Sequence, residues 1–164
     1  MRAILGQQVS VAAAGAMYAR LLERYGGRTP TPQEVLAEQP ETLRAAGGLS
    51  RAKVVFLRSL AERVVAGTLD LEALEQRPDQ EVIAQLTSVK GIGAWTAQIF
   101  LMLHLERADV VAPGDLGIRR AVMIAYGLPG PPTPDQVDAL AEAWRPYRTL
   151  ACRVLWASQA TTPL

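Results

Sequence analysis

Apolar residues recur every three or four positions along most of this chain, which is the period of an amphipathic helix. The segment after Ser50 shows the pattern most clearly, with apolar residues at Val54, Leu57, Leu60, Ala61 and Val64. No segment alternates apolar and polar residues over the length of a strand. The pattern therefore predicts an all-α fold.

Capping residues, prolines and glycines divide this pattern into separate helices. Thr31-Pro-Gln-Glu34 and Thr133-Pro-Asp-Gln136 each combine a cap residue, proline at the first helical position and an acid or amide three residues after the cap. The glycines at 26–27, 47–48 and 67 are typical of helix ends. The predicted helices cover about 1–25, 32–38, 40–46, 51–66, 69–76, 79–86, 94–105, 115–126, 137–144 and 146–156.

Composition limits the kinds of partner that the chain can have. Its 164 residues are 49% hydrophobic, which suffices for one compact domain with a full core. The net charge is only +1, so a nucleic-acid surface would have to come from the placement of charge. Acidic residues crowd the stretch 70–81, whereas Lys90, Arg119 and Arg120 flank the candidate site described below. We expect the acidic stretch to face away from DNA; the alternative is that both groups are ordinary solvated helix faces.

Cys152 is the only cysteine and His104 the only histidine. The chain therefore cannot form an internal disulfide or hold an iron-sulfur cluster or zinc ion through cysteines, and we expect no required cofactor. The sequence shows no charged leader with a long apolar region, and no apolar run reaches the roughly 18 to 20 residues that span a bilayer. We expect an intracellular, soluble protein.

The segment 86–97 is the most informative part of the chain. It places Gly91 and Gly93 around one apolar residue and between two predicted helices. Such a turn exposes backbone amides at the start of the next helix, where a phosphate can bind, and Lys90 and Thr96 would add to that surface. Contacts of this kind position a duplex without reading its sequence. Taken alone, a Gly-x-Gly between helices is more often just a tight turn.

An isolated acid, Asp115, follows this segment after Pro113-Gly114 and precedes a predicted helix. Local sequence favours an ordinary N-cap for this residue. The other interpretation is a catalytic carboxylate, and only the wider pattern of motifs supports it.

Several motifs, in order along the chain, resemble the helix-hairpin-helix DNA glycosylases, most closely the 3-methyladenine DNA glycosylase II type. They are Ile4-Leu-Gly-Gln-Gln-Val-Ser10, Gly48-Leu-Ser-Arg-Ala-Lys53, Val89-Lys-Gly-Ile-Gly-Ala-Trp-Thr-Ala97, Pro113-Gly-Asp115 and Trp144-Arg-Pro-Tyr-Arg148. The resemblance runs from Ile4 to Trp156 and implies a two-lobed helical domain with a catalytic cleft between the lobes. One lobe would contain about 1–27 plus 113–164, and the other about 28–112 with the hairpin at 87–97.

The resemblance implies base excision, in which a damaged nucleotide is flipped out of the duplex because its glycosidic bond cannot be reached inside the stack. It assigns the catalytic carboxylate to Asp115, which would stabilise the positive charge that develops on the deoxyribose and orient or deprotonate the attacking water. Relatives that also cut the strand have a lysine two residues after the second glycine, whereas this chain has Trp95. Water is therefore the expected nucleophile and an abasic site the expected product.

The same resemblance implies a base pocket and a wedge. Trp95 and Trp156 would wall the pocket, where an electron-rich ring can stack on a base made cationic by methylation. Gln7 and Ile99 would line it as well, although Ile99 stands where relatives have an aromatic residue. Gln8 would be a polar wedge that fills the gap left by the flipped base. The alternatives are packing roles for the tryptophans and plain solvation for two glutamines on a first helix.

Further contacts follow from the resemblance. Ser50, Arg51 and Lys53 resemble a second helix start that contacts the DNA backbone, with a capped, solvated helix end as the alternative. The hairpin suggests a sodium or potassium ion held by backbone carbonyls of Thr87, Val89 and Ile92.

The expected partner is double-stranded DNA with damaged bases, above all alkylated purines such as 3-methyladenine, and no membrane. We expect a monomer in the bacterial cytoplasm, associated with the nucleoid. Relatives have additional helices before the segment that matches Ile4, so the chain would be a minimal form, a truncated one, or one that covers apolar surface by association. Two other functions stay open: a non-catalytic helix-hairpin-helix DNA-binding module, and an interaction protein whose hairpin only packs.

Overall fold

The computed structural model describes residues 1–160, and every regular element in that range is helical, as the sequence predicts. The chain divides into two compact units, Met1–Ala97 (unit 1) and Gln98–Leu164 (unit 2). The helices of unit 1 are α1 (Arg2–Leu5), α2 (Val11–Arg24), α3 (Pro32–Ala37), α4 (Pro40–Gly47), α5 (Arg51–Val65), the 3-10 turn η1 (Ala73–Gln76) and α6 (Asp79–Thr87). Those that follow are α7 (Ala94–Leu103), α8 (Leu116–Ala125), α9 (Pro134–Ala141), the 3-10 turn η2 (Glu142–Trp144) and α10 (Arg148–Ala160).

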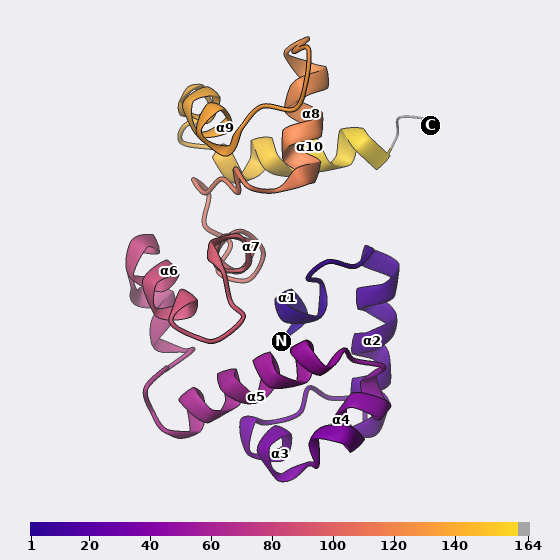
Figure 1. Ribbon diagram of the computed structural model, residues 1–164. Helices are drawn as coiled ribbons and strands as arrows, with labels where there is room; N and C mark the ends of the chain where they lie inside the picture. The colour runs from indigo at the N-terminus through magenta and orange to yellow at the C-terminus, as the bar shows by residue number, and fades with distance from the viewer. Residues whose placement is uncertain (161–164) are drawn as a thin grey trace. The chain divides into compact units, whose positions relative to one another are not determined.

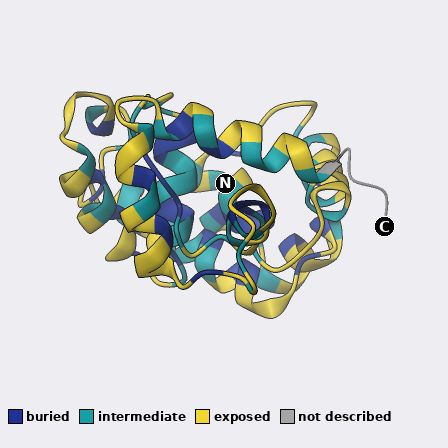
Figure 2. Ribbon diagram, turned by 90° about the horizontal axis from the view of Figure 1, so that it is seen from above, coloured by how far each residue is buried: buried dark blue, intermediate teal, exposed yellow. Residues whose placement is uncertain are grey.

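Unit 1 is organised around α5. Helices α1, α3 and α4 pack against α5, and α2 packs against α1 and α4 (Figure 1). Leu21 of α2, Leu43 of α4 and Leu57 of α5 are almost completely buried. Burial of each such side chain stabilises the unit by about 1.5–3 kcal/mol before the entropic cost of ordering it. Figure 2 shows the buried residues on the inner sides of the helices and the exposed ones on their outer sides.

Unit 2 is built on α10, which packs along α8, while α8 also contacts α9. Its core includes Ile118, Val122, Val137 and Cys152, all fully buried. Burial raises the pKa of the Cys152 thiol to about 11. The single cysteine is therefore a protonated packing residue at neutral pH.

The predicted capping boxes are confirmed at the starts of α3 and α9. Thr31 and Glu34 exchange hydrogen bonds between side chain and backbone, as do Thr133 and Gln136. Ser50 caps α5 by accepting a hydrogen bond from the Lys53 amide. These helix starts follow from local chemistry, because the side-chain oxygen replaces a missing backbone partner.

The prediction of one continuous helix over 1–25 is wrong. The structure ends α1 at Leu5 and begins α2 at Val11, with Ser10 as the N-cap of α2. Gln8, in the connecting segment, has a φ of +56°, a left-handed conformation that no helix interior accommodates. The two glutamines therefore lie in a break between α1 and α2 and not within one continuous helix, and the side chain of Gln8 is exposed there.

One smaller prediction also needs correction. The predicted helix over 69–76 is only a 3-10 turn, Ala73–Gln76, because the side chain of Asp70 accepts hydrogen bonds from the amides of Glu72 and Ala73 and turns the chain first. Residues 1–27 pack with α4 and α5 in unit 1, and the predicted division into two lobes stays a prediction.

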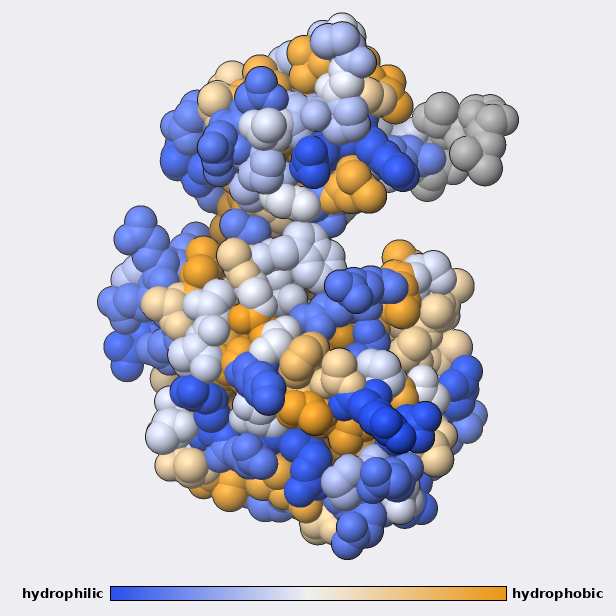
Figure 3. Space-filling view, in the orientation of Figure 1, coloured by the Kyte–Doolittle hydropathy of each residue, from blue (hydrophilic) through white to orange (hydrophobic). Residues whose placement is uncertain are grey.

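Hydrophilic side chains cover much of the visible surface of each unit, with apolar side chains between them (Figure 3). This mixed surface is consistent with the net charge of +1. Within residues 1–160, no helix combines the length and the apolar character needed to cross a bilayer.

Candidate functional site

The predicted hairpin connects α6 to α7. Ser88 ends α6, the Ile92 amide donates to the Val89 carbonyl at 3.0 Å, and the Gly93 carbonyl accepts from the Ala97 amide to begin α7. Val89 and Ile92 are buried, which fixes the turn to the core of unit 1. Gly93 and Lys90 are exposed. The turn therefore presents a backbone with no side chain at Gly93 and a cation at Lys90, a surface that suits a phosphate.

The two glycines of the hairpin have different physical roles. Gly91 has a φ of +84°, and a Cβ atom there would lie 2.1 Å from the ring of Phe56 on α5. Gly93 has an ordinary φ, and a Cβ atom there would meet nothing within 4 Å. The fold therefore requires glycine at position 91. At position 93 the fold would accept a side chain, and glycine there only keeps the outer surface of the turn uncovered.

A groove of about 490 Å³ runs beside the hairpin, and we call it the hairpin groove. Its lining comes from α5 and the turn and consists of Ser59, Arg63 and the residues 87–93. Arg63 donates to the Ser88 hydroxyl at 3.1 Å, which places a guanidinium beside the turn. Thr87, Val89 and Ile92, whose carbonyls are predicted to bind an ion, all belong to this lining.

Gln7 ties the break between α1 and α2 to the hairpin. Its side-chain amide donates to the Gly91 carbonyl at 2.8 Å and to the Thr96 hydroxyl at 2.9 Å. Its own carbonyl accepts a hydrogen bond from the Lys53 ammonium at 2.7 Å. The resemblance implies a base-pocket role for Gln7 and a DNA contact for Lys53, and the hairpin sequence predicts a DNA contact for Thr96. In the structure all three residues make internal hydrogen bonds, which no local pattern predicts.

Burial distinguishes the residues predicted to contact the DNA backbone. Lys53 retains only 7% exposure and Thr96 only 4%. Burial lowers the pKa of the Lys53 ammonium, because water no longer stabilises its charge. Ser50 and Arg51, at the start of α5, are exposed, as is Gln8. The side chains that stay available to a ligand in this part of unit 1 are therefore those of Gln8, Ser50, Arg51 and Lys90.

Asp115 lies at the start of α8 in unit 2. Its Oδ1 atom accepts a hydrogen bond from the Ile118 amide at 2.9 Å, which makes it the N-cap that local sequence favours. The same oxygen accepts a second hydrogen bond from the indole N–H of Trp156 on α10, also at 2.9 Å. Charge-assisted hydrogen bonds of this kind fix the orientation of a carboxylate. The N-cap reading is confirmed, and the link to Trp156 adds a constraint that a simple cap does not need.

Two neighbours of Asp115 were missed by sequence analysis. A Cβ atom at Gly117 would lie 2.9 Å from the Asp115 carboxylate and 3.3 Å from the Trp156 ring. The Gln159 side-chain amide donates to the Gly117 carbonyl and links the end of α10 to the start of α8. A glycine two residues after a candidate catalytic acid, inside a helix where alanine is favoured, is the signal that could have found it.

The remaining predicted pocket residues lie on α7 and α10. Trp95, in the first turn of α7, is half-buried within unit 1, and Ile99, four residues later in the same helix, is also half-buried. Trp156 is half-buried on α10 and bonded to Asp115. The base pocket that these residues would form together stays a prediction.

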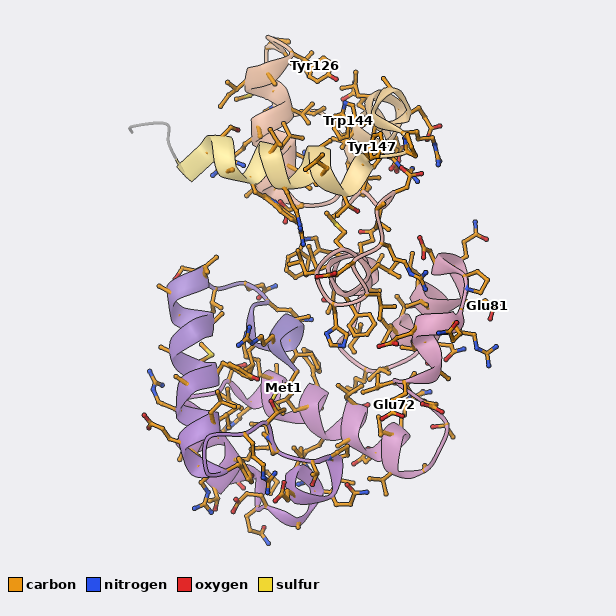
Figure 4. All side chains as sticks on the ribbon, turned by 180° about the vertical axis from the view of Figure 1, so that it is seen from behind. Met1, Glu72, Glu81, Tyr126, Trp144 and Tyr147 are labelled. Atoms are coloured by element: carbon orange, nitrogen blue, oxygen red, sulfur yellow. The ribbon has the colours of Figure 1, made fainter. Side chains whose placement is uncertain are left out.

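Other surfaces differ in character from these. Glu72 and Glu81 belong to the acidic stretch and point outward at the α6 end of unit 1 (Figure 4). In unit 2, Tyr126, Trp144 and Tyr147 lie close together (Figure 4), and the Trp144 indole donates to the Tyr126 hydroxyl at 2.9 Å. Trp144 is therefore held at the surface of unit 2 by this hydrogen bond. Among the described residues, no group of three or more His, Cys, Asp or Glu side chains could hold a metal ion.

Comparison with known proteins gives a consistent result. The sequence model of the family "HhH-GPD superfamily base excision DNA repair protein" matches residues 1–146. The chain is 36% identical over 158 residues to DNA-3-methyladenine glycosylase 1 of Schizosaccharomyces pombe, an alignment that covers 95% of this chain and 69% of that protein. It is 34% identical over 173 residues to DNA-3-methyladenine glycosylase 2 of Escherichia coli, which covers 99% of this chain and 57% of that protein.

Solved structures agree with these sequence matches. The S. pombe 3-methyladenine DNA glycosylase in complex with abasic DNA superimposes with a TM-score of 0.92 at 35% identity, covering 98% of this chain and 79% of that one. A DNA-3-methyladenine glycosidase from Bacillus halodurans gives a TM-score of 0.82 at 38% identity, covering 98% and 73%. The chain thus spans 57% of the length of its E. coli relative and 69% of its fission yeast relative.

The contrast between the hairpin glycines gives a paired prediction. Gly91→Ala should reduce the free energy of unfolding by about 2–4 kcal/mol, because the left-handed φ and the Phe56 ring both oppose a Cβ atom. Gly93→Ala should change it by less than about 0.5 kcal/mol yet weaken binding of duplex DNA about fivefold or more, because its methyl group projects from the exposed turn. Urea denaturation and a DNA titration measure the two effects. Equal stabilities, or unchanged DNA affinity in Gly93→Ala, would contradict the assignment.

Proposed function

Because the chain belongs to the HhH-GPD superfamily of base excision DNA repair proteins, we propose that it is a monofunctional DNA glycosylase that removes alkylated purines such as 3-methyladenine and leaves an abasic site. The observation that carries the proposal is the double anchoring of the Asp115 carboxylate by the Ile118 amide and the Trp156 indole. A carboxylate fixed in this way cannot rotate freely away from a reacting sugar.

The chemistry requires such an anion. As the bond between base and deoxyribose breaks, positive charge develops on the sugar ring, as in other glycoside cleavages. A carboxylate already oriented before reaction stabilises that charge without reorganisation, and it can also orient or deprotonate the attacking water. Anchoring through Oδ1 therefore fits Asp115 for electrostatic stabilisation of this transition state.

The nucleophile in this proposal is water. Trp95 occupies the position two residues after Gly93, so no lysine amine stands there to attack the sugar and form a Schiff base. The product is an abasic site on an intact strand. The tryptophans would then stack on the extruded base, most strongly on one carrying a positive charge from methylation.

DNA would be held by the exposed groups of unit 1. Lys90 and the backbone at Gly93, together with Ser50 and Arg51 at the start of α5, are available for phosphate contacts. Gln8 is exposed and held in a left-handed conformation, a costly backbone state that recurs at functional sites, and it would fill the gap left by the flipped base.

A monovalent ion at the hairpin remains part of the proposal. Carbonyl oxygens suit a hard cation such as sodium or potassium, and Thr87, Val89 and Ile92 line the hairpin groove together. The Val89 carbonyl already accepts one hydrogen bond from the Ile92 amide, which leaves it a second lone pair for an ion. Such an ion would add positive charge where a phosphate is expected.

We further propose that the protein works as a monomer on chromosomal DNA in the bacterial cytoplasm. The second candidate function is a non-catalytic DNA-binding module, and the exposed Lys90 and Gly93 of the hairpin suit DNA binding in either case. In the glycosylase Asp115 has a catalytic role, whereas in the non-catalytic module it is only the N-cap of α8.

Asp115→Asn supplies that distinction. The amide retains a hydrogen-bond acceptor for the cap but loses the negative charge, so binding of undamaged duplex should stay within about twofold of the parent, while release of 3-methyladenine falls by at least about 100-fold. Single-turnover release from methylated DNA measures the chemical step. Release at the parent rate would remove Asp115 from catalysis; binding without release by the parent would favour the non-catalytic module.

Gly117→Ala tests the geometry of the carboxylate instead of its charge. The added methyl group would lie 2.9 Å from the Asp115 carboxylate, so the carboxylate must shift and its hydrogen bonds to Ile118 and Trp156 must weaken. Stability should fall by no more than about 1–2 kcal/mol, because the weaker N-cap is partly offset by the higher helix propensity of alanine. Base release should fall about tenfold or more, because small misplacements of a catalytic group are costly. A variant as active as the parent would show that the position of Asp115 is not critical.

The substrate range and product are tested together by a panel of lesions. Duplexes containing 3-methyladenine, 7-methylguanine, hypoxanthine or ethenoadenine are incubated with the parent protein, and borohydride is added to trap any Schiff base. The proposal predicts release of the cationic methylpurines, an unbroken strand and no trapped adduct. Trapping of a covalent adduct would contradict the assignment of water as the nucleophile.

A further inference from the structure

The exposed Gln8 has a left-handed backbone conformation that its own side chain does not stabilise. A residue other than glycine in a left-handed conformation is strained by about 1–3 kcal/mol, and it persists only where the surroundings determine it. Gln8 has a φ of +56° and its side chain is exposed, so its own side chain is not buried in packing that could hold it. The support must come through the backbone of its neighbours.

The preceding residue, Gln7, is held at both ends. Its carbonyl, which belongs to the peptide unit shared with Gln8, accepts the Lys53 ammonium at 2.7 Å. Its side-chain amide donates to the Gly91 carbonyl at 2.8 Å and to the Thr96 hydroxyl at 2.9 Å. Lys53 and Thr96 are almost completely buried, where little water competes for these hydrogen bonds.

Helix α5 contacts both the segment that precedes Gln8 and the hairpin. Lys53 and Phe56 lie three residues apart and so on one face of this helix. Lys53 holds the peptide before Gln8, while the Phe56 ring occupies the space where Gly91 would carry a Cβ atom. One face of α5 thus fixes residues 7–8 and the hairpin relative to each other, and the Gln7 side chain connects the two directly.

Burying the Lys53 ammonium is energetically unfavourable because it loses hydration, and burial lowers its pKa. A neutral, apolar side chain could fill the same space without that cost. The charge does, however, supply a strong donor to one particular carbonyl, that of Gln7.

We infer that Lys53 and Gln7 are positioning residues that hold Gln8 in its left-handed conformation against the hairpin, so that insertion into the duplex and the grip on the phosphates occur as one rigid movement. This inference rests on the proposed function, in which Gln8 enters the gap left by a flipped nucleotide. It predicts that the ammonium of Lys53 acts on base flipping and not on affinity for intact DNA, although a lysine near a DNA-binding surface would ordinarily be assigned to a phosphate.

A double-mutant cycle tests the inference. The variants are Lys53→Met, Gln8→Ala and the two combined, with Arg44→Met, which removes an exposed cation of α4, as the matched control. The probe is a duplex carrying 2-aminopurine beside a tetrahydrofuran abasic nucleotide, whose fluorescence rises when the stack opens. Melting temperatures of all variants are measured first, and assays are run well below the lowest.

Lys53→Met and Gln8→Ala should each reduce the fluorescence rise about fivefold or more, and the double variant should be no worse than Gln8→Ala, because residues that act through one another are not additive. Affinity of Lys53→Met for undamaged duplex should stay within about twofold of the parent, whereas Lys90→Met should weaken it and lower its salt dependence. Arg44→Met should behave as the parent. Additive losses in the double variant, or weakened binding of undamaged duplex by Lys53→Met, would overturn the inference.

A measurement without DNA separates this inference from the proposed function. Amide hydrogen exchange over residues 6–10 should become faster in Lys53→Met and in Gln7→Met, while exchange within α2 stays unchanged. Unchanged protection over residues 6–10 would refute the positioning role. A parent protein that opens the stack but releases no base would refute the glycosylase proposal and leave the inference intact; a parent that leaves the fluorescence unchanged would refute the wedge and the inference with it.

Discussion

The interaction on which the account depends is the hydrogen bond between the Trp156 indole and the Asp115 carboxylate. An acid at a helix start is ordinary, because an N-cap satisfies the orphan amides there. Here the same oxygen also accepts a donor from another helix, and the neighbouring Gly117 leaves the space that this arrangement needs. The helices α8 and α10 that pack to form the core of unit 2 therefore also determine where the carboxylate points.

In unit 1, too, the residues that pack the core also fix the residues proposed to contact DNA. The hairpin is attached to the core through Val89 and Ile92 and braced by Phe56, while its outer side stays exposed at Lys90 and Gly93. Gln7 connects the hairpin to the break between α1 and α2, and the left-handed Gln8 follows it at the surface. Hydrogen bonds made by the half-buried Gln7 and the buried Lys53 thus support an exposed neighbour, which is the usual basis of preorganisation.

Local signals predicted much of this structure from the sequence. The capping boxes at Thr31 and Thr133, the cap at Ser50 and the helix start at Asp115 depend on residues within one turn of each other, so the pattern sufficed. The break at Gly6–Ser10 was missed because alanine-rich, apolar sequence resembles a continuous helix and the left-handed Gln8 has no local signature. The internal roles of Lys53 and Gln7 could not be predicted either, since their partners are 46 and 84 residues away in the sequence.

The charge of Asp115 is the central claim, and comparing two abasic-site analogues tests it most directly. A pyrrolidine nucleotide carries the positive charge of the transition state, and a tetrahydrofuran nucleotide has the same shape without it. The account predicts that the protein binds duplex DNA containing pyrrolidine at least about tenfold more tightly than duplex containing tetrahydrofuran, and that Asp115→Asn removes this preference. Equal affinity for the two duplexes in the parent protein, or a preference that persists in Asp115→Asn, would contradict it.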